Sequence, residues 1–145
     1  MSRSDHFDKT ISFDVMKQIT LDHRSHLVNA YRFRCTQSAA HCAMDLTLHA
    51  IERGFVGDRK LIKGNTMEEW CRKGSATLWA IYAACELLFD MDYVPDSFDE
   101  YVTFIFIYLD SHALMVDSVD AAMAVFPASF DRDIVHFVVD KYFSA

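Results

Sequence analysis

Histidines and carboxylates recur at helical spacing in the segment AAHCAMDLTLHAIERG, residues 39–54. His41, Asp45 and His49 are four residues apart in turn, and Glu52 follows three residues later. Residues four apart are neighbours on a helix, so an imidazole and a carboxylate there could share a divalent transition metal. His41 and His49 would be separated by roughly 12 Å along the helix axis, which is too far for one ion. A metal site would therefore combine Asp45 with one histidine and take further ligands from another helix.

The same stripe also has an ordinary structural interpretation. An apolar stripe runs beside it and would face a core; its members are Ala40, Met44, Leu48, Ile51 and Phe55. The polar stripe would then lie at the margin of that core as weak i, i+4 pairs. The chain has one Asp-x-x-His, at Asp133 and His136, and no Glu-x-x-His, so the di-iron signature is incomplete. We expect no cofactor, and a metal-dependent bundle enzyme that uses His41, Asp45 and His49 is the alternative.

The cysteines are the second group with possible chemistry, and none of them forms a CxxC pair: Cys35, Cys42, Cys71 and Cys85. A chain of 145 residues can bury a core without disulfides, and the segment MSRSDHFDKT has no apolar stretch of the secretory kind. We therefore expect reduced, mostly buried thiols in a cytoplasmic protein.

The common catalytic and nucleotide-binding motifs are absent. The sequence contains no Walker loop, no GxGxxG after a strand, no HExxH, no EF-hand loop and no GxSxG elbow. These absences argue against the usual nucleotide-hydrolysing enzymes. They favour a protein that binds another protein and has no chemistry of its own.

Charge is unevenly distributed along the chain. Residues 1–85 hold twelve Lys/Arg and nine Asp/Glu, whereas residues 86–145 hold two Lys/Arg and twelve Asp/Glu. Five of these carboxylates gather around one loop and the start of the next helix: Asp90, Asp92, Asp96, Asp99 and Glu100. We expect them to face a basic surface of a nucleic-acid-handling protein, where they would occupy positions that phosphates take. Solubility alone is the alternative explanation.

Direct nucleic-acid binding is not expected. The basic residues of segment 59–73 are its candidates, but the chain carries a net charge of −7. A negative chain is repelled by the phosphate backbone that dominates such binding.

The pattern of apolar residues and caps predicts helices throughout. Ser12 caps a first helical segment over residues 13–53, which we expect to break into two helices near residues 34–38. Thr66 and Glu69 form a capping box before a helix over 67–89, in which Glu86 is the only charge between Gly74 and Leu88. This helix should be central and bury Leu78, Trp79 and Tyr82.

The C-terminal segments are predicted in the same way. Ser97 and Glu100 form a second capping box. The run YVTFIFIYL, residues 101–109, suits a strand by composition, but the box before it and the lack of a pairing partner favour a helix. Asp117 is expected to cap a short helix over 118–126. Ser129 is expected to cap a last helix that ends near Phe143.

Together these features predict an all-α fold, a single compact bundle of five or six helices. The domain spans residues 1–145, with a flexible N-terminus over 1–11 and no membrane span. The aromatic side chains of the C-terminal segments either fill the core or are partly buried in a homodimer or against a partner: Phe104, Phe106, Tyr108, Phe137, Tyr142 and Phe143. We expect a small protein-binding module, such as an adaptor, an assembly subunit or a stoichiometric inhibitor.

Overall fold

The computed structural model describes residues 7–144, and this part of the chain forms eight α-helices and no strand. The prediction of an all-α fold is confirmed. The predicted number of five or six helices is wrong, because the two longest predicted segments are each interrupted once more than expected. By its internal contacts the chain divides into two compact units. Unit 1 comprises residues 1–23 and 94–145, and unit 2 comprises residues 24–93. The single domain over 1–145 stays a prediction.

Segment 13–53 forms three helices: α1 Phe13–His23, α2 His26–Arg34 and α3 Ala39–Arg53. The predicted break at residues 34–38 is confirmed, and Ser38 caps α3 by accepting a hydrogen bond from the His41 backbone N–H. The break between α1 and α2 was not predicted. There the Ser25 hydroxyl accepts the Ala76 backbone N–H at 3.1 Å, a contact with a distant segment that no local pattern reveals.

Segment 67–89 is not one helix but two, α4 Gly64–Lys73 and α5 Leu78–Phe89. Gly74 ends α4 with a φ of +65°, a left-handed conformation that glycine adopts without strain. Thr66 is not the cap of α4, because the helix begins at Gly64. A Cβ on Gly64 would lie 2.8 Å from the Ala40 backbone nitrogen, so α4 begins at a very close approach to α3.

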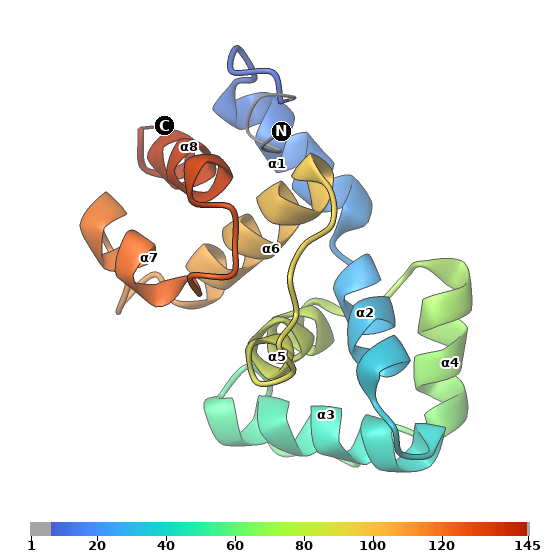
Figure 1. The fold of residues 1–145 in the computed structure, drawn as a ribbon. Helices are drawn as coiled ribbons and strands as arrows, with labels where there is room; N and C mark the ends of the chain where they lie inside the picture. Colours follow the sequence, from blue (N-terminus) through green and yellow to red (C-terminus); the bar gives the residue numbers. More distant parts are fainter. Residues whose placement is uncertain (1–6, 145) are drawn as a thin grey trace. The chain divides into compact units, whose positions relative to one another are not determined.

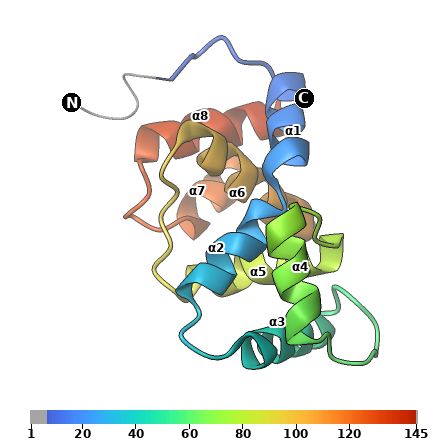
Figure 2. The same cartoon turned by 90° about the vertical axis from the view of Figure 1, so that its right-hand side faces the viewer.

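In unit 2, α5 packs against α2 and α3, and α4 packs against α3 and α2 (Figures 1 and 2). The centre of α5 is fully buried at Ile81, Ala84 and Leu88. Its start is not: Leu78 is 41 % exposed, and Trp79 and Tyr82 are half-buried. The expected burial is therefore wrong for Leu78, which lies just after the break that divides the predicted helix.

Unit 1 is built around α6 Phe98–Ser111, which packs against α1 and α8 Arg132–Phe143, while α7 Val119–Val125 packs on α8 (Figure 1). The helix predicted for residues 101–109 is confirmed, and it is buried on nearly every side. Phe104 and Phe106 lie inside the unit, 0 % and 2 % exposed. For these two rings the core alternative is confirmed.

The caps of the last helices lie one or two residues after the predicted positions. Ser118 rather than Asp117 caps α7, and Asp131 rather than Ser129 caps α8.

At the other end of the chain, the predicted flexible terminus lies partly outside the described residues. Phe7, inside them, stacks on Phe98 with 5.3 Å between ring centroids. No helix in residues 7–144 combines the length and the apolar character that crossing a membrane requires.

Candidate functional site

The polar stripe of α3 lies on the surface of unit 2, and its members contact different partners. His41 Nε2 lies 3.3 Å from Asp45 Oδ2, and both side chains are more than 40 % exposed. His49 Nε2 instead contacts Glu86 Oε1 on α5 at 2.8 Å. The same Glu86 carboxylate accepts hydrogen bonds from Arg53, the last residue of α3. The stripe is therefore divided between a local contact, His41 with Asp45, and a contact of His49 with another helix.

This arrangement bears on the metal alternative. Residues 7–144 contain no group of three or more His, Cys, Asp or Glu side chains that could hold a metal ion. His41 and Asp45 are in contact, but no third ligand of these types joins them in the described structure. His49 is directed to a carboxylate on another helix instead.

A disulfide joins Cys35, just after α2, to Cys42 in the first turn of α3, with 6.5 Å between their Cα atoms. The expectation of four reduced cysteines is therefore wrong for these two. The physical reason is the break at residues 35–38, which brings the C-terminal end of α2 close to the N-terminal end of α3. Cys71 and Cys85 are free thiols, and burial raises the pKa of both.

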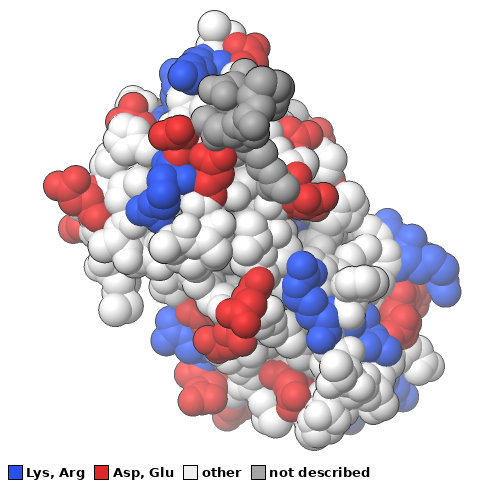
Figure 3. All heavy atoms as spheres, in the orientation of Figure 1, with Lys and Arg blue, Asp and Glu red and all other residues white. Residues whose placement is uncertain are grey.

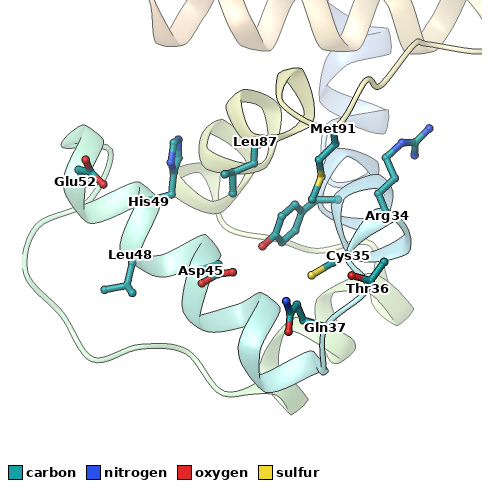
Figure 4. A pocket seen from close by; sticks show the side chains of 11 residues that line it. Arg34, Cys35, Thr36, Gln37, Asp45, Leu48, His49, Glu52, Leu87 and Met91 are labelled. Carbon is teal, nitrogen blue, oxygen red and sulfur yellow. The ribbon is translucent and has the colours of Figure 1, made fainter.

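An open cavity of about 450 Å³ lies beside the disulfide, between α2, α3 and α5 (Figure 4). Asp45, His49 and Glu52 of the stripe line one wall, and Arg34 lines the other side. The remaining lining residues are mostly uncharged: Tyr31, Cys35, Thr36, Gln37, Leu48, Leu87 and Met91. A cavity of this volume is in the range of small-molecule sites.

Tyr31 is the most deeply buried residue of the cavity wall, 2 % exposed. Its hydroxyl donates a hydrogen bond to the Cys42 carbonyl oxygen at 3.0 Å. Burial, and then the negative charge of Asp45, raise the pKa of Tyr31 to about 12. At neutral pH the cavity therefore offers a neutral phenol beside a carboxylate.

The five carboxylates predicted to bind a partner are all exposed, and they belong to both units. Asp90 and Asp92 follow α5 in unit 2. Asp96, Asp99 and Glu100 surround the start of α6 in unit 1. The predicted capping box forms there in a modified way: the Ser97 hydroxyl accepts the Glu100 N–H, and the Glu100 carboxylate accepts the N–H of Asp96.

Several basic residues near the nucleic-acid candidate segment 59–73 are engaged within unit 2. Arg32 donates to Glu68 at 2.6 Å, and Lys73 donates to Glu69. Arg59 lies over the Trp79 ring, 4.9 Å from its centroid. These contacts reduce the positive charge available for phosphates.

Two features of the cavity region were missed by reasoning from the sequence. The disulfide had a weak signal, because Cys35 and Cys42 bracket the predicted helix break. Glu86 had a stronger one, since it is the only charged residue between Gly74 and Leu88 in a helix that is otherwise apolar. A lone charge on such a helix needs a partner.

Comparison of the chain with protein-family models, with curated proteins and with solved structures found no match.

Proposed function

We propose that this chain is a small protein-binding module whose carboxylates at Asp90, Asp92, Asp96, Asp99 and Glu100 engage a basic, nucleic-acid-binding surface of another protein. We call these five side chains the 90–100 carboxylates. The module acts as an adaptor or a stoichiometric inhibitor.

The observation that carries the proposal is the charge of unit 1, to which Asp96, Asp99 and Glu100 belong. Its sequence holds thirteen Asp/Glu against five Lys/Arg, a net charge of −8, whereas unit 2 holds eight against nine, a net charge of +1. Such an imbalance repels itself in the folded state, so a partner of opposite charge gives it a use. Asp and Glu side chains reach the surface at several separate places in the view of Figure 3.

The basic residues of unit 1 add to this argument, because several are directed to groups other than carboxylates. Arg132 donates to the backbone carbonyl oxygens of Met123 and Phe126, at 2.7 and 2.9 Å. Lys141 lies over the ring of Phe137, and Lys9 lies over the ring of Phe7.

The decisive experiment neutralises three of the 90–100 carboxylates. The variant Asp92→Asn/Asp96→Asn/Asp99→Asn changes the net charge by three with little change of shape. Asparagine is chosen because Asp92 has a φ of +55°, which asparagine tolerates. The matched control is Asp14→Asn/Asp117→Asn/Asp140→Asn, three exposed positions of unit 1 outside the 90–100 carboxylates.

Both variants and the wild type are used to capture proteins from a lysate of the native cell over a salt series. Mass spectrometry identifies the proteins that the first variant fails to hold and the control retains, and duplex DNA is added as a competitor. We expect those proteins to be released by DNA. With one such protein purified, the first variant should associate more slowly and show a flatter salt dependence. If the wild type and both variants capture the same proteins equally at every salt concentration, the proposal is contradicted.

The cytoplasmic location is a separate proposal. Four reduced cysteines would support a cytoplasmic location, and the Cys35–Cys42 disulfide removes that support. Self-association likewise stays a prediction. Phe33, Leu114 and Met115 are the most exposed large apolar side chains among the described residues.

A further inference from the structure

The Cys35–Cys42 disulfide and the cavity beside it belong to unit 2, and they offer a chemistry that the proposed function of the 90–100 carboxylates does not use. Cys35 lines the cavity, and Figure 4 shows its sulfur among the side chains that surround the opening. Cys42 is fully buried, 0 % exposed, whereas Cys35 is partly exposed. A thiol that enters the cavity therefore reaches the Cys35 sulfur before the Cys42 sulfur.

We propose that this disulfide is a thiol-exchange site, at which a small zwitterionic thiol of the cysteine-peptide class binds in the cavity and becomes attached to Cys35 as a mixed disulfide. The incoming thiolate attacks Cys35 Sγ, and the Cys35–Cys42 bond breaks. Cys42 leaves with the electron pair as a thiolate. One disulfide is exchanged for another, so no separate oxidant or reductant is needed.

The surroundings of Cys42 suit a leaving group. The Arg32 Nε donates to Glu68, but its Nη1 lies 3.9 Å from the Cys42 Sγ, and an N–H group of a guanidinium at this position stabilises a thiolate. The Cys42 sulfur also lies 3.7 Å from the Gln37 carbonyl oxygen. After Cys42 takes a proton from solvent, its thiol can donate a weak hydrogen bond to that oxygen. Both protonation states of the released cysteine therefore have a partner.

The charges around the cavity select the class of thiol. Arg34 lines the outer rim of the cavity, where Figure 4 shows its guanidinium directed away from Cys35, so it can receive only the far carboxylate of a peptide thiol. Asp45 and Glu52 on the opposite wall can receive an ammonium group. The Arg34 guanidinium lies 4.7 Å from the centroid of the Tyr93 ring, which limits its motion. Thr36 and Gln37 add polar groups next to Cys35. A thiol peptide with both a free amine and a carboxylate matches this distribution, and a neutral thiol does not.

The first experiment locates the attachment. Purified, oxidised protein is mixed with reduced glutathione without oxygen, quenched with acid at short times, alkylated and digested for peptide mass spectrometry. We expect the early product to carry glutathione on Cys35 and an alkylated, released Cys42. Cys71 and Cys85 are thiols and cannot exchange with a reduced thiol, so they serve as internal controls. Attachment at Cys42, or no adduct at Cys35 at any time, overturns the proposal.

The second experiment tests recognition with a series of thiols. Exchange rates are measured for glutathione, cysteine, cysteamine, 3-mercaptopropionate and 2-mercaptoethanol, and each is corrected for the basicity of its thiol. We expect glutathione, whose amine and glycine carboxylate lie at opposite ends of the molecule, to react faster than cysteine, whose two charges share one carbon, and faster than the cationic, anionic and neutral thiols. Corrected rates that are equal across the series overturn the cavity as a binding site.

Variants connect that selectivity to named residues. Arg34→Gln should reduce the rate for glutathione relative to 2-mercaptoethanol by about two- to fivefold, as expected for a partly exposed ion pair. Arg72→Gln, the same charge change on α4 outside the cavity, should leave the ratio unchanged. Asp45→Asn should lower the ratio in the same way, and Asp58→Asn in the loop before α4 should not. If each cavity variant behaves like its control, the charges do not recognise the thiol.

A trapped form provides a readout that does not depend on the short-lived mixed disulfide. In Cys42→Ser the thiol of Cys35 has no partner to close on. Glutathione disulfide should then modify Cys35 stably and faster than Cys71, because Cys35 lines the cavity and burial raises the pKa of the Cys71 thiol. Circular dichroism verifies that the variant is folded. Modification of Cys71 before Cys35 contradicts the proposed accessibility.

Discussion

Glu86 and His49 join α5 to α3 through a contact of 2.8 Å between Oε1 and Nε2. Arg53 donates to the same carboxylate through Nε at 2.8 Å and Nη2 at 2.9 Å. The Glu86 side chain is only 13 % exposed, so its charge is largely removed from water. A desolvated carboxylate needs such partners, and here both come from the C-terminal half of α3.

Replacing Glu86 by Gln should therefore destabilise unit 2. The amide keeps the shape but cannot provide the charge that Arg53 and His49 face, and we expect a loss of about 1–3 kcal/mol in the free energy of unfolding. Urea denaturation measures it. The control is Glu69→Gln, which breaks the exposed pair with Lys73 and should leave the midpoint nearly unchanged. Equal shifts for the two variants would mean that Glu86 is no more important than a surface charge.

The helical class could be predicted because local signals agreed with the tertiary structure. The run 101–109 has strand-like composition, yet Ser97 caps it and the helix buries almost every face in unit 1. The break before α3 could be predicted for the same reason, since Ser38 is a strong cap.

The features that the sequence analysis did not predict depend on contacts between distant segments. The end of α1 coincides with a hydrogen bond from Ala76 to Ser25, and α4 begins where Gly64 meets Ala40. In the candidate site, the spacing of His41 and Asp45 did predict their contact. The partner of His49 is 37 residues away in the sequence, so its spacing could not reveal it.

Gly64 is expected to be intolerant of a side chain. A Cβ there would lie 2.8 Å from the Ala40 nitrogen and 3.0 Å from the Ala39 carbonyl carbon, both of which are backbone atoms. Gly64→Ala should separate α4 from α3 and lower the free energy of unfolding by about 1–3 kcal/mol. Thermal and urea unfolding measure the effect.

The matched control for that change is Gly57→Ala, because nothing lies within 4 Å of a Cβ at Gly57. It should be neutral or slightly stabilising, since alanine restricts the unfolded chain. A Gly64→Ala protein that is as stable as Gly57→Ala would contradict the close approach of the two helices.

The four cysteines should react in a defined order with an alkylating reagent. In the native, oxidised protein Cys71 should react slowly and Cys85 not at all, because burial raises the pKa of both thiols and Cys85 is fully buried. Denaturant alone should expose two reactive cysteines, and denaturant with a reductant should expose all four. Intact mass spectrometry counts the alkyl groups. Four groups without reductant would exclude the disulfide.

Tyr31 links the cavity to the stability of unit 2 at high pH. Its phenol is buried and donates to the Cys42 carbonyl oxygen, and its pKa is raised from 10.0 to about 12. Between these two pH values the unfolded chain loses a proton that the folded protein keeps. The folded state therefore loses stability as the pH rises through this window, and the contribution of Tyr31 is complete only below pH 10.

The variant Tyr31→Phe should change that dependence in a predictable direction. At neutral pH it should be less stable than the wild type by about 1 kcal/mol, because the hydrogen bond to Cys42 is lost. As the pH rises above 10 the wild type weakens through the ionisation of Tyr31 in its unfolded state, and the variant does not, so the difference should shrink. Urea midpoints from neutral pH to pH 11.5 would measure it, and an ultraviolet titration of the folded wild type should show one phenol that ionises near pH 12 and is missing in the variant. Stability curves that stay parallel at every pH would mean that the Tyr31 phenol ionises as readily in the fold as in water.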